Sequence, residues 1–589
     1  MGTRRGLLRG LAASAVGGVA LGTIGAIAQR GALAATLTAS WRRLSGQLPA
    51  VENPTSWAQT PAPRQVSVNI DLTPGRAISP SIYGVSVAGA DQLVATGARV
   101  NRWGGNPNTR YNWMHGAAWN AARDWEFRNY GGAPFGGVQQ RVADGYVSDT
   151  RASGADAWIS IPAIGWVAKD SDNGHMSSGV PPDGGPPTDA NAEASAGYDP
   201  AANRTTTSVR SLARKPWPFA DDPAPISDLV FQDEWVHHLV SKFGTAEAGG
   251  VRYYAFDNEP DLWSSTHTDV HPVQLTYDDM LAAFLEYATA IKDVDPSAQV
   301  TGPTLSGWTA LWYSARDRGL DNFRSHADRR AHGDTPFLAW WLARVRQHDE
   351  AAGCRSLDFL DVHYYPQAGG VFAPMVGDEA TQRLRLRSTR SLWDPTYVDE
   401  SWISEAVELV PRLRTWRDEL YPGTGLAIGE WNWGAEDTLN GALAIANVLG
   451  IFGREGIDLA SYWTSPKPGS PAAHAFRLYT NYDGLGSAFG DRSLAATSTS
   501  PDDVAVYASR DSSTGDGVIV VLNHRPDAAV PTRIQVGPTD QAISAARWFM
   551  YGFADPTRIR DMGNVPVSEK TFSLVLGPES ASVLRVILR

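Results

Sequence analysis

Hydrophobic and polar positions follow two different patterns along this chain, and the change between them divides it. Between about residues 81 and 487, short apolar β-rich runs alternate with stretches of helical periodicity, which is typical of parallel βα units. Eight such runs occur, the number of strands in a closed (β/α)8 TIM barrel. The runs are 81–87, 98–105, 155–163, 251–259, 298–304, 357–365, 425–431 and 457–463.

Two of the intervening stretches carry clear helix signals. Thr276 is a suitable N-cap for 277–294, where apolar residues recur at helical spacing. A second stretch, 440–455, follows the seventh run and ends near Gly456, a residue type that commonly terminates helices. Both helices support an alternating α/β chain.

After about residue 488 the pattern becomes one of short alternating strands separated by turn residues, which predicts a β-sandwich over 488–589. The run within 66–80 has no place in the barrel count, so we expect it to pair into that sandwich. The fold class is therefore α/β, a (β/α)8 barrel over 81–487 with a C-terminal β-sandwich. Two long Gly-, Pro- and Asp-rich connections, about 166–227 and 366–424, follow strand ends and should wall the active-site cleft.

The N-terminal residues 1–34 have the features of an export signal and are left out of the fold. Arg4 and Arg5 form a twin-arginine motif, and a Gly/Ala/Leu-rich stretch follows them. The sequence Ala-Leu-Ala at 32–34 offers a signal peptidase site. An uncleaved membrane anchor is the alternative reading, although the Gly/Ala composition is only weakly apolar. Residues 35–65 lack periodicity and are interpreted as a linker.

Composition narrows the function. The 43% hydrophobic and 19% charged residues describe an ordinary globular protein, and a length of 589 residues exceeds what one core usually organises. A formal net charge of −12 argues against a nucleic-acid partner, because phosphates would be repelled. Cys354 is the only cysteine, so no intramolecular disulfide can form, which suits a protein folded in the cytosol before export.

Two acidic motifs stand at the ends of the fourth and seventh runs. VRYYAFDNEPDLW places Glu259, and GLAIGEWNWG places Glu430, where a buried strand opens into a Trp-rich loop. The carboxyl ends of barrel strands form the active-site face, and the fourth and seventh strands meet across its mouth. Retaining glycosidases use two carboxyl groups about 5–5.5 Å apart, one as acid/base and one as nucleophile. We therefore predict Glu259 and Glu430 as a catalytic pair.

Neighbouring residues supply plausible partners for this pair. Asn258 is placed to donate a hydrogen bond to a sugar 2-hydroxyl. His363 and Tyr365, two positions apart at the end of the sixth run, should point to the same side, one to hold substrate and the other to bond Glu430. Arg102, at the end of the second run, can supply positive charge that keeps Glu430 ionised, and it is also a candidate substrate contact.

Tryptophan is the commonest aromatic residue, with 22 against 19 Tyr and 17 Phe, and flat indoles suit stacking on sugar rings. Trp103, Trp431 and Trp463 lie beside the predicted catalytic positions and are candidate substrate contacts. A core-packing role is the alternative for about half of the tryptophans.

The arrangement resembles the 4/7 superfamily of retaining glycoside hydrolases. The strings VNRWGGNPNTRYNW, DNEPDLWSSTHTDVHP, DVHYYP, LWDPTYVDESWI and IGEWNWG look like glycoside hydrolase family 44 over most of 66–589. By position, this resemblance implies Glu259 as acid/base, Glu430 as nucleophile, Asn258 as 2-hydroxyl partner and Tyr365 as the nucleophile's partner. It further implies endo-β-1,4-glucanase activity on soluble cellulose derivatives and xyloglucan, and it allows for a structural calcium ion of unassigned ligands.

A metal site is not predicted from the residues themselves. His267, Asp269 and His271 have ligand-like side chains, but three residues within five positions of one loop rarely complete a metal shell. We expect them to brace the loop behind Glu259.

The sequence thus predicts a secreted retaining endo-β-1,4-glucanase that is a monomer, needs no cofactor and, once the signal is removed, meets no membrane. Its partner would be a β-1,4-linked polysaccharide. An endo-β-mannanase or xylanase of the same fold is the alternative, because subsite loops rather than the two glutamates select the sugar. A non-catalytic glycan-binding protein is disfavoured, since both carboxylates are intact.

Overall fold

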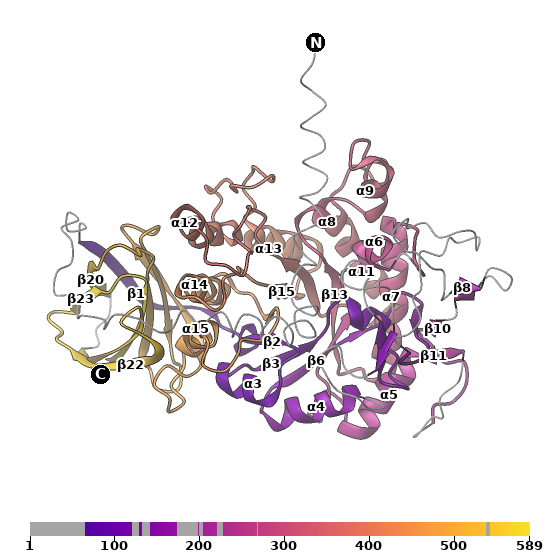
Figure 1. Ribbon diagram of the computed structural model, residues 1–589, viewed down its shortest axis with the longest axis horizontal. Coiled ribbons are helices and arrows are strands. Elements are labelled where there is room, and N and C mark those ends of the chain that lie inside the picture. The colour runs from indigo at the N-terminus through magenta and orange to yellow at the C-terminus, as the bar shows by residue number, and fades with distance from the viewer. Residues whose placement is uncertain are drawn as a thin grey trace, which may run out of the picture.

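The computed structural model describes residues 65–119, 129–131, 142–172, 198–199, 204–205, 207–220, 228–267, 269–537 and 542–588. The predicted signal 1–34 and all but the last residue of the linker 35–65 lie outside these ranges. Within them, no helix is both long and apolar enough to span a bilayer. A barrel and a β-sandwich lie side by side, with helices α14 (Leu439–Glu455) and α15 (Pro471–Thr480) next to the sandwich (Figure 1).

The barrel has eight parallel strands that pair in chain order, and the last strand pairs with the first. Each strand falls within one of the eight apolar runs, except that the fifth strand ends at Leu305, one residue beyond its run, so the predicted barrel is confirmed. The strands are β2 (Gly84–Ser86), β3 (Val100–Trp103), β6 (Asp156–Ile161), β12 (Tyr253–Phe256), β13 (Gln299–Leu305), β14 (Phe359–Tyr364), β15 (Gly425–Trp431) and β16 (Leu459–Tyr462).

The helix signals in the sequence are borne out by local structure. Helix α7 (Tyr277–Val294) begins after Thr276, whose hydroxyl accepts from the amide of Asp279 while the Asp279 carboxylate accepts in return from the Thr276 amide. Helix α14 ends at Gly456 in the left-handed conformation. The long connection 366–424 contains α12 (Glu379–Arg387), the 3-10 helix η4 (Ser388–Leu392) and α13 (Leu409–Leu420).

Side chains of the barrel strands face two separate apolar clusters. A small interior cluster fills the barrel, and a large outer cluster lies between the strands and the surrounding helices. Because successive side chains of a strand point to opposite sides, most strands contribute to both, whereas β2 and β13 contribute only to the outer cluster. The interior cluster consists of Val100, Trp158, Tyr253, Ala255, Ala427 and Leu459.

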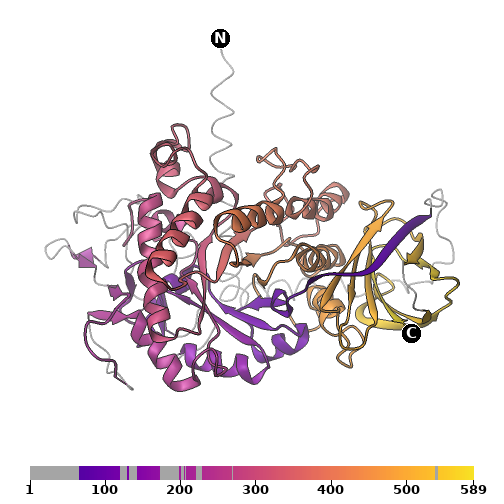
Figure 2. The same ribbon diagram turned by 180° about the vertical axis from the view of Figure 1, so that it is seen from behind.

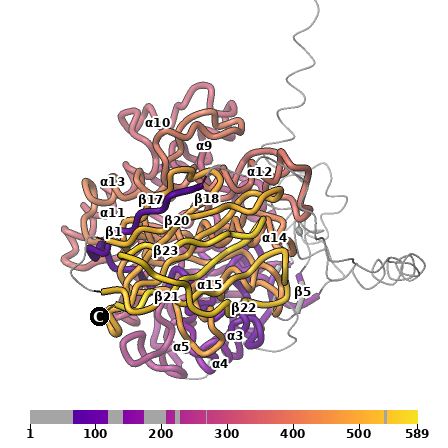
Figure 3. Tube along the Cα trace, turned by 90° about the vertical axis from the view of Figure 1, so that its left-hand side faces the viewer, coloured from indigo at the N-terminus to yellow at the C-terminus, as the bar shows by residue number. Residues whose placement is uncertain are grey.

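The sandwich is a single nine-stranded sheet that folds over so that its two edge strands, β22 (Asp555–Val565) and β23 (Thr571–Leu576), contact each other. As expected, the N-terminal run joins it: β1 (Val66–Ala77) lies between β17 (Arg492–Ser498) and β20 (Val530–Val536) (Figures 2 and 3). The remaining strands are β18 (Val504–Arg510), β19 (Gly517–Asn523), β21 (Ile543–Gly552) and β24 (Ser580–Leu588).

The alternating pattern in the sequence did not reveal two of the sandwich strands, β17 and β22. Most of their residues are polar and at least partly exposed, so the alternation that marks the other strands is weak in them. The exact division into 66–80, 81–487 and 488–589 stays a prediction.

Candidate active site

The two predicted glutamates meet at the carboxyl ends of the barrel strands. Glu259 follows β12 and Glu430 lies in β15, and their exposed fractions are only 2% and 4%. Single nitrogen or oxygen atoms of Glu259, His363 and Glu430 all lie within 4.8 Å of one another. Such a close approach of single atoms agrees better with the carboxyl separation of retaining glycosidases, about 5–5.5 Å, than with the roughly 6.5–9.5 Å of inverting ones.

The backbone around Glu259 is held in an unusual conformation. Asp257 and Glu259 have φ angles of 53° and 46°, in the left-handed region that costs a non-glycine residue about 1–3 kcal/mol. The Glu259 amide donates to the carbonyl of Thr304 at 3.1 Å, and the buried Asp257 carboxylate accepts from Thr109 Oγ1 at 2.6 Å and from the Ala163 amide at 2.7 Å. These bonds fix the turn that presents Glu259.

A β-bulge orients Glu430. Along the β14–β15 pair, Val362 aligns with Ile428 but His363 aligns with Glu430, so Gly429 is an extra residue in β15. A Cβ at Gly429 would lie 2.6 Å from Asp361 Oδ1, so only glycine fits there. If Gly429 took a regular strand position, strict alternation from Ile428, which faces the outer cluster, would turn Glu430 outward as well.

Arg102 connects the site from within the barrel. Its fully buried guanidinium donates through Nη1 to Glu430 Oε1 at 2.7 Å and through Nη2 to Asn258 Oδ1 at 2.8 Å. The prediction placed it both as the counter-charge of Glu430 and as a substrate contact. The ion pair agrees with the first role, whereas its complete burial corrects the second, because no part of its side chain reaches the surface.

His363 lies between the two glutamates. Its Nδ1 is 2.9 Å from Glu259 Oε1 and 3.5 Å from Glu430 Oε2, and its Nε2 is 3.5 Å from Arg102 Nη2. Burial, and secondarily Arg102, lowers the pKa of His363 well below its usual value, so the ring is neutral. Because Arg102 is purely a donor, Nε2 accepts and the Nδ1–H donates to Glu259. His363 thus holds a carboxylate, not the substrate as one prediction had it.

Tyr365 completes the environment of Glu430. Its hydroxyl donates to Glu430 Oε2 at 2.9 Å. Burial raises the pKa of Glu430, while the Arg102 guanidinium and the Tyr365 hydroxyl oppose that rise. Both carboxylate oxygens of Glu430 are therefore hydrogen-bonded by groups that favour its charged form.

The prediction of sugar stacking is wrong for two of the three tryptophans. Trp103 is 1% exposed and packs edge-on against Tyr111 and Tyr146, and Trp431 is fully buried against Phe452 and other aromatic rings. Both side chains belong to the outer cluster between strands and helices. The reason is alternation, since each follows an inward-pointing residue, Arg102 or Glu430, and must face the opposite side.

Trp463 and Asn258 do lie at the site. Trp463 is partly exposed, and its amide donates to the carbonyl of Trp431 at 3.0 Å. Its ring lies against Gly105, where a Cβ would be 2.4 Å from Cη2 of the indole. The amide of Gly105 in turn donates to Asn258 Oδ1 at 3.1 Å, and Asn258 Nδ2 donates to Asn106 at 3.2 Å. This chain links the indole to the residue beside Glu259.

Trp402 was not singled out in the sequence. It is 49% exposed on the long connection after β14, and its indole N–H donates to Gln367 Oε1 at 3.2 Å. Gln367 Nε2 donates to the carbonyl of Tyr365 at 2.9 Å, so Trp402 is two hydrogen bonds from a partner of Glu430. The available signal was a tryptophan within a polar connection that follows a catalytic strand.

The loop with the ligand-like side chains is held by an ion pair. Asp269 is completely buried and accepts from Arg110 Nη1 at 2.9 Å and Nη2 at 3.1 Å. Burial lowers the pKa of His267 well below its usual value and lowers that of His271. The bidentate pair supports a bracing role for this loop, with Arg110 as the residue that the sequence did not reveal.

Among the described residues, the closest set of three metal-ligand side chains is Glu259, His363 and Glu430 themselves. A cation there would meet the guanidinium of Arg102, which already holds Glu430. The calcium ion implied by the family resemblance stays a prediction without ligands.

Comparison with known proteins identifies relatives over most of the chain. The glycoside hydrolase family 44 model matches residues 118–368. Endoglucanase A of Paenibacillus lautus is 30% identical over 519 residues, which cover 85% of this chain and 69% of that protein. A bifunctional glucanase-xylanase from a metagenome library is 38% identical, with a TM-score of 0.78 over 89% of this chain and 99% of that one. A family 44 xyloglucanase of Paenibacillus polymyxa is 28% identical, with a TM-score of 0.77 over the same shares.

Proposed function

Because this chain belongs to glycoside hydrolase family 44, we propose that it is a retaining endo-β-1,4-glucanase that acts on cellulose-type glucans and xyloglucan. The observation that carries the mechanism is the close approach of Glu259 and Glu430 together with their different partners. The activities named for the relatives, endoglucanase, glucanase-xylanase and xyloglucanase, support the substrate class.

In this mechanism Glu430 is the nucleophile. Arg102 and Tyr365 donate to its two oxygens and favour the carboxylate, so that one oxygen attacks the anomeric carbon as the glycosidic C–O bond breaks. The same donors hold the carboxylate in one orientation before substrate arrives, which reduces the reorganisation needed in the transition state.

Glu259 is the acid/base. In the first step it gives its proton to the departing glycosidic oxygen, which leaves a glycosyl ester on Glu430. In the second step its carboxylate takes a proton from water, whose oxygen attacks the anomeric carbon and releases Glu430. The neutral His363 donates to Glu259 Oε1 and so holds this carboxyl group in one orientation at the site.

Three side chains are proposed to position the sugar. Asn258 keeps one amide hydrogen beyond its bond to Asn106 and is proposed to donate it to the 2-hydroxyl. Trp463 is proposed as the platform for the sugar at the cleavage site, and the half-exposed Trp402 as a platform for a neighbouring sugar.

A polysaccharide panel tests this function. Reducing-sugar release is measured on carboxymethylcellulose, xyloglucan, mannan and xylan, with Glu259→Gln and Glu430→Gln as matched inactive controls. Release from the two glucans, abolished in both variants, supports the proposal. Release mainly from mannan or xylan would support the alternative, and binding without release would identify a glycan-binding protein.

Secretion is proposed from the sequence alone. Arg4→Lys with Arg5→Lys should leave unprocessed protein in the cytosol, because the twin-arginine receptor reads the arginine pair. Normal secretion of this double variant would point to the general secretory route, and a membrane-bound, unprocessed wild type would point to an anchor.

We also propose that the enzyme acts as a monomer without a cofactor. Light scattering should give a molar mass near that of one chain, and dialysis against a chelator should leave turnover unchanged. A fall in melting temperature after the same dialysis would support a structural calcium ion, whereas a loss of turnover without unfolding would contradict cofactor independence.

A further inference from the structure

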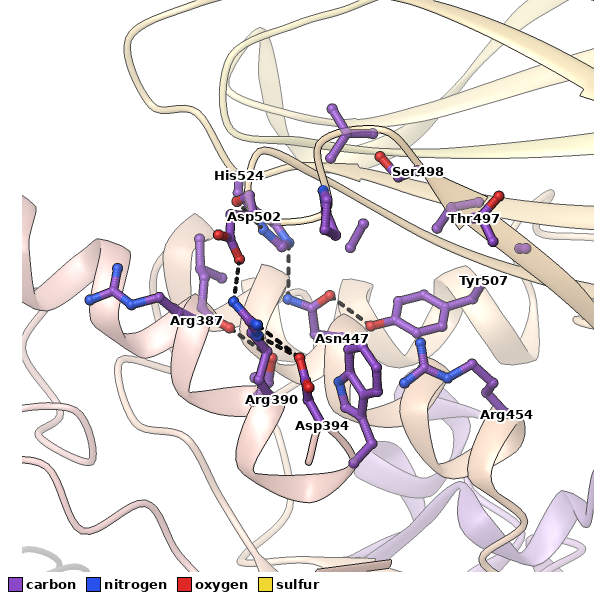
Figure 4. A pocket seen from close by; sticks show the side chains of 18 of the residues that line it. Arg387, Arg390, Asp394, Asn447, Arg454, Thr497, Ser498, Asp502, Tyr507 and His524 are labelled. Carbon is purple, nitrogen blue, oxygen red and sulfur yellow. Dashed lines mark hydrogen bonds and ion pairs between the residues drawn. The ribbon is translucent and has the colours of Figure 1, made fainter. Parts of the chain in front are cut away.

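A second cavity, separate from the glutamate pair, lies between the barrel helices and the sandwich (Figure 4). Its volume is about 410 Å³, within the range of roughly 300–1,000 Å³ typical of small-molecule sites. Its walls come from α12, η4 and α14 on one side and from β17 and β18 on the other. Interfaces between domains are a common place for such sites.

The cavity lies away from the catalytic centre along α14. This helix starts after the Glu430 loop, and the cavity is lined by Asn447 in its middle and Arg454 in its last turn. At about 1.5 Å per residue, Arg454 is about 20 Å along the helix from its start. Arg102, His363 and Tyr365, the side chains described above as bonded to Glu259 or Glu430, do not line the cavity.

Each arginine that lines the cavity is held by at least one carboxylate. Arg390 bonds both Asp394 and Asp502, at 2.9 Å and 3.0 Å, and Arg454 bonds Glu455 at 2.8 Å. The third lining cation, Arg387, bonds Glu400 at 2.6 Å. With three arginines each held by carboxylates, the cavity favours a neutral ligand over an anion or a cation.

A hydrogen-bonded series of neutral groups crosses the boundary between the two parts. The Tyr507 hydroxyl donates to Asn447 Oδ1 at 3.0 Å, and Asn447 Nδ2 donates to His524 Nε2 at 2.9 Å. His524 Nδ1 then donates to the carbonyl of Asp502 at 3.1 Å. Burial lowers the pKa of His524 to about 4, which agrees with a neutral ring. The series fixes the Tyr507 ring, which also lies against Gly450 of α14.

Aromatic and aliphatic surface lines the same cavity, beside an arginine with an unpartnered donor. Trp393 and Tyr507 line it beside Val504 and Val506. The Arg454 guanidinium carbon lies 4.1 Å from the centroid of the Trp393 ring, and the buried Nη2 of Arg454 has no hydrogen-bond partner within the described part of the chain. Aromatic and aliphatic walls with few polar groups match a ligand that has apolar faces and hydroxyl groups at its edge.

We propose that this cavity is a second glycan-binding site, which takes one or two residues of a neutral β-linked gluco-oligosaccharide. Sugar rings lie against Trp393 and Tyr507, and Arg454 turns its buried Nη2 toward the ligand to donate to a sugar oxygen. The choice of a glucan rests on the proposed function, whereas the neutral character and the size follow from the cavity itself. A ligand there touches both the barrel and the sandwich, so binding stabilises their contact.

The test uses isothermal titration calorimetry of cellotriose into the full-length Glu430→Gln protein, which cannot complete turnover. Thr497 is exposed at the cavity wall, and Ala495 is exposed two positions earlier on β17 without lining it. Thr497→Trp therefore obstructs the cavity, and Ala495→Trp is the matched control. We expect two ligands per chain in Glu430→Gln and with Ala495→Trp added, but one with Thr497→Trp added.

A second variant covers the case in which Thr497→Trp misfolds or fails to obstruct. Arg454→Met keeps an apolar stem against Trp393 but removes the free donor, and a hydrogen bond to a charged group corresponds to about tenfold or more in affinity. The weaker of the two binding events should fall by that factor while the other is unchanged. One ligand per chain in every protein, or two events untouched by both variants, overturns the second site.

Failure of this inference is distinguishable from failure of the proposed function. Wild-type release of reducing sugar from glucans together with a single cellotriose site removes only the second site. Absence of glucan hydrolysis removes the proposed function, whatever the number of binding sites.

Discussion

Replacing Tyr365 with phenylalanine tests how the site controls the charge of Glu430. The change removes only the hydroxyl that donates to Glu430 Oε2 at 2.9 Å, in a place where both side chains are about 4% exposed. A hydrogen bond to a charged group is worth about 1.5–3 kcal/mol, and one pKa unit corresponds to about 1.36 kcal/mol. The pKa of Glu430, already raised by burial, should therefore rise further, by at most the energy of that bond because Arg102 remains.

The sign of the kinetic effect follows from the charge that attack requires. Glu430 reacts as the carboxylate, so a higher pKa moves the acidic limb of the pH profile of kcat/KM to higher pH. On that limb activity should fall by about tenfold or more, with a smaller loss on the plateau.

The assay is a full pH profile of kcat/KM on a soluble glucan for the wild type, Tyr365→Phe and the control Tyr364→Phe. Tyr364 is the adjacent residue of β14 and faces outward, where its ring lies 5.9 Å from that of Trp433. The control should keep the wild-type limb. An unshifted limb in Tyr365→Phe, or an equal shift in both variants, would refute the reasoning.

Three further predictions concern residues around the pair. Trp463→Ala should lower kcat as well as kcat/KM, because stacking at the cleavage site acts on the distorted ring; a change in KM alone would move this indole to a distant subsite. Gly105→Ala should lower kcat in steady-state assays, because Gly105 has a φ of 94° and an added Cβ would lie 2.4 Å from that indole and displace it. Gly145→Ala is the control and should not lower kcat, since open space surrounds Gly145. Burial raises the pKa of Asp361 from 3.8 to about 6, so the folded state favours the protonated carboxyl group. This preference stabilises the fold fully below pH 3.8, and the stabilisation is lost as the pH rises through 6. In urea titrations the wild type should therefore lose up to about 3 kcal/mol relative to Asp361→Asn across that window, and a constant difference would count against a protonated Asp361.

The sequence was sufficient for the barrel because all its strands are buried on both faces and so appear as apolar runs bounded by polar loops. Glu259 and Glu430 could be placed for the same reason, since each ends such a run. Strands β17 and β22 were not predicted because a polar, exposed strand has no distinctive hydrophobic period. The bracing role of Arg110 was not predicted because its partner Asp269 is remote in the chain.

Side-chain direction was the weaker part of the prediction. In β3 the alternation rule gives the correct answer: if Arg102 faces inward, the next residue, Trp103, must face away from the site. In β15 the same rule fails by itself, because the bulge at Gly429 resets the register one residue before Glu430. A single sequence gives no sign of that bulge beyond a glycine inside a strand.

The central claim is that Glu430 forms a covalent bond to the sugar while Glu259 transfers the proton. The most direct test is incubation of the wild type with an activated 2-deoxy-2-fluoro cellobioside, a substrate that forms the glycosyl-enzyme but hydrolyses it slowly, followed by peptide mass mapping. The account predicts one added 2-deoxy-2-fluorocellobiosyl group per chain, located on Glu430, and none in Glu430→Gln. A label on Glu259, or hydrolysis with inversion and no labelled peptide, would contradict it.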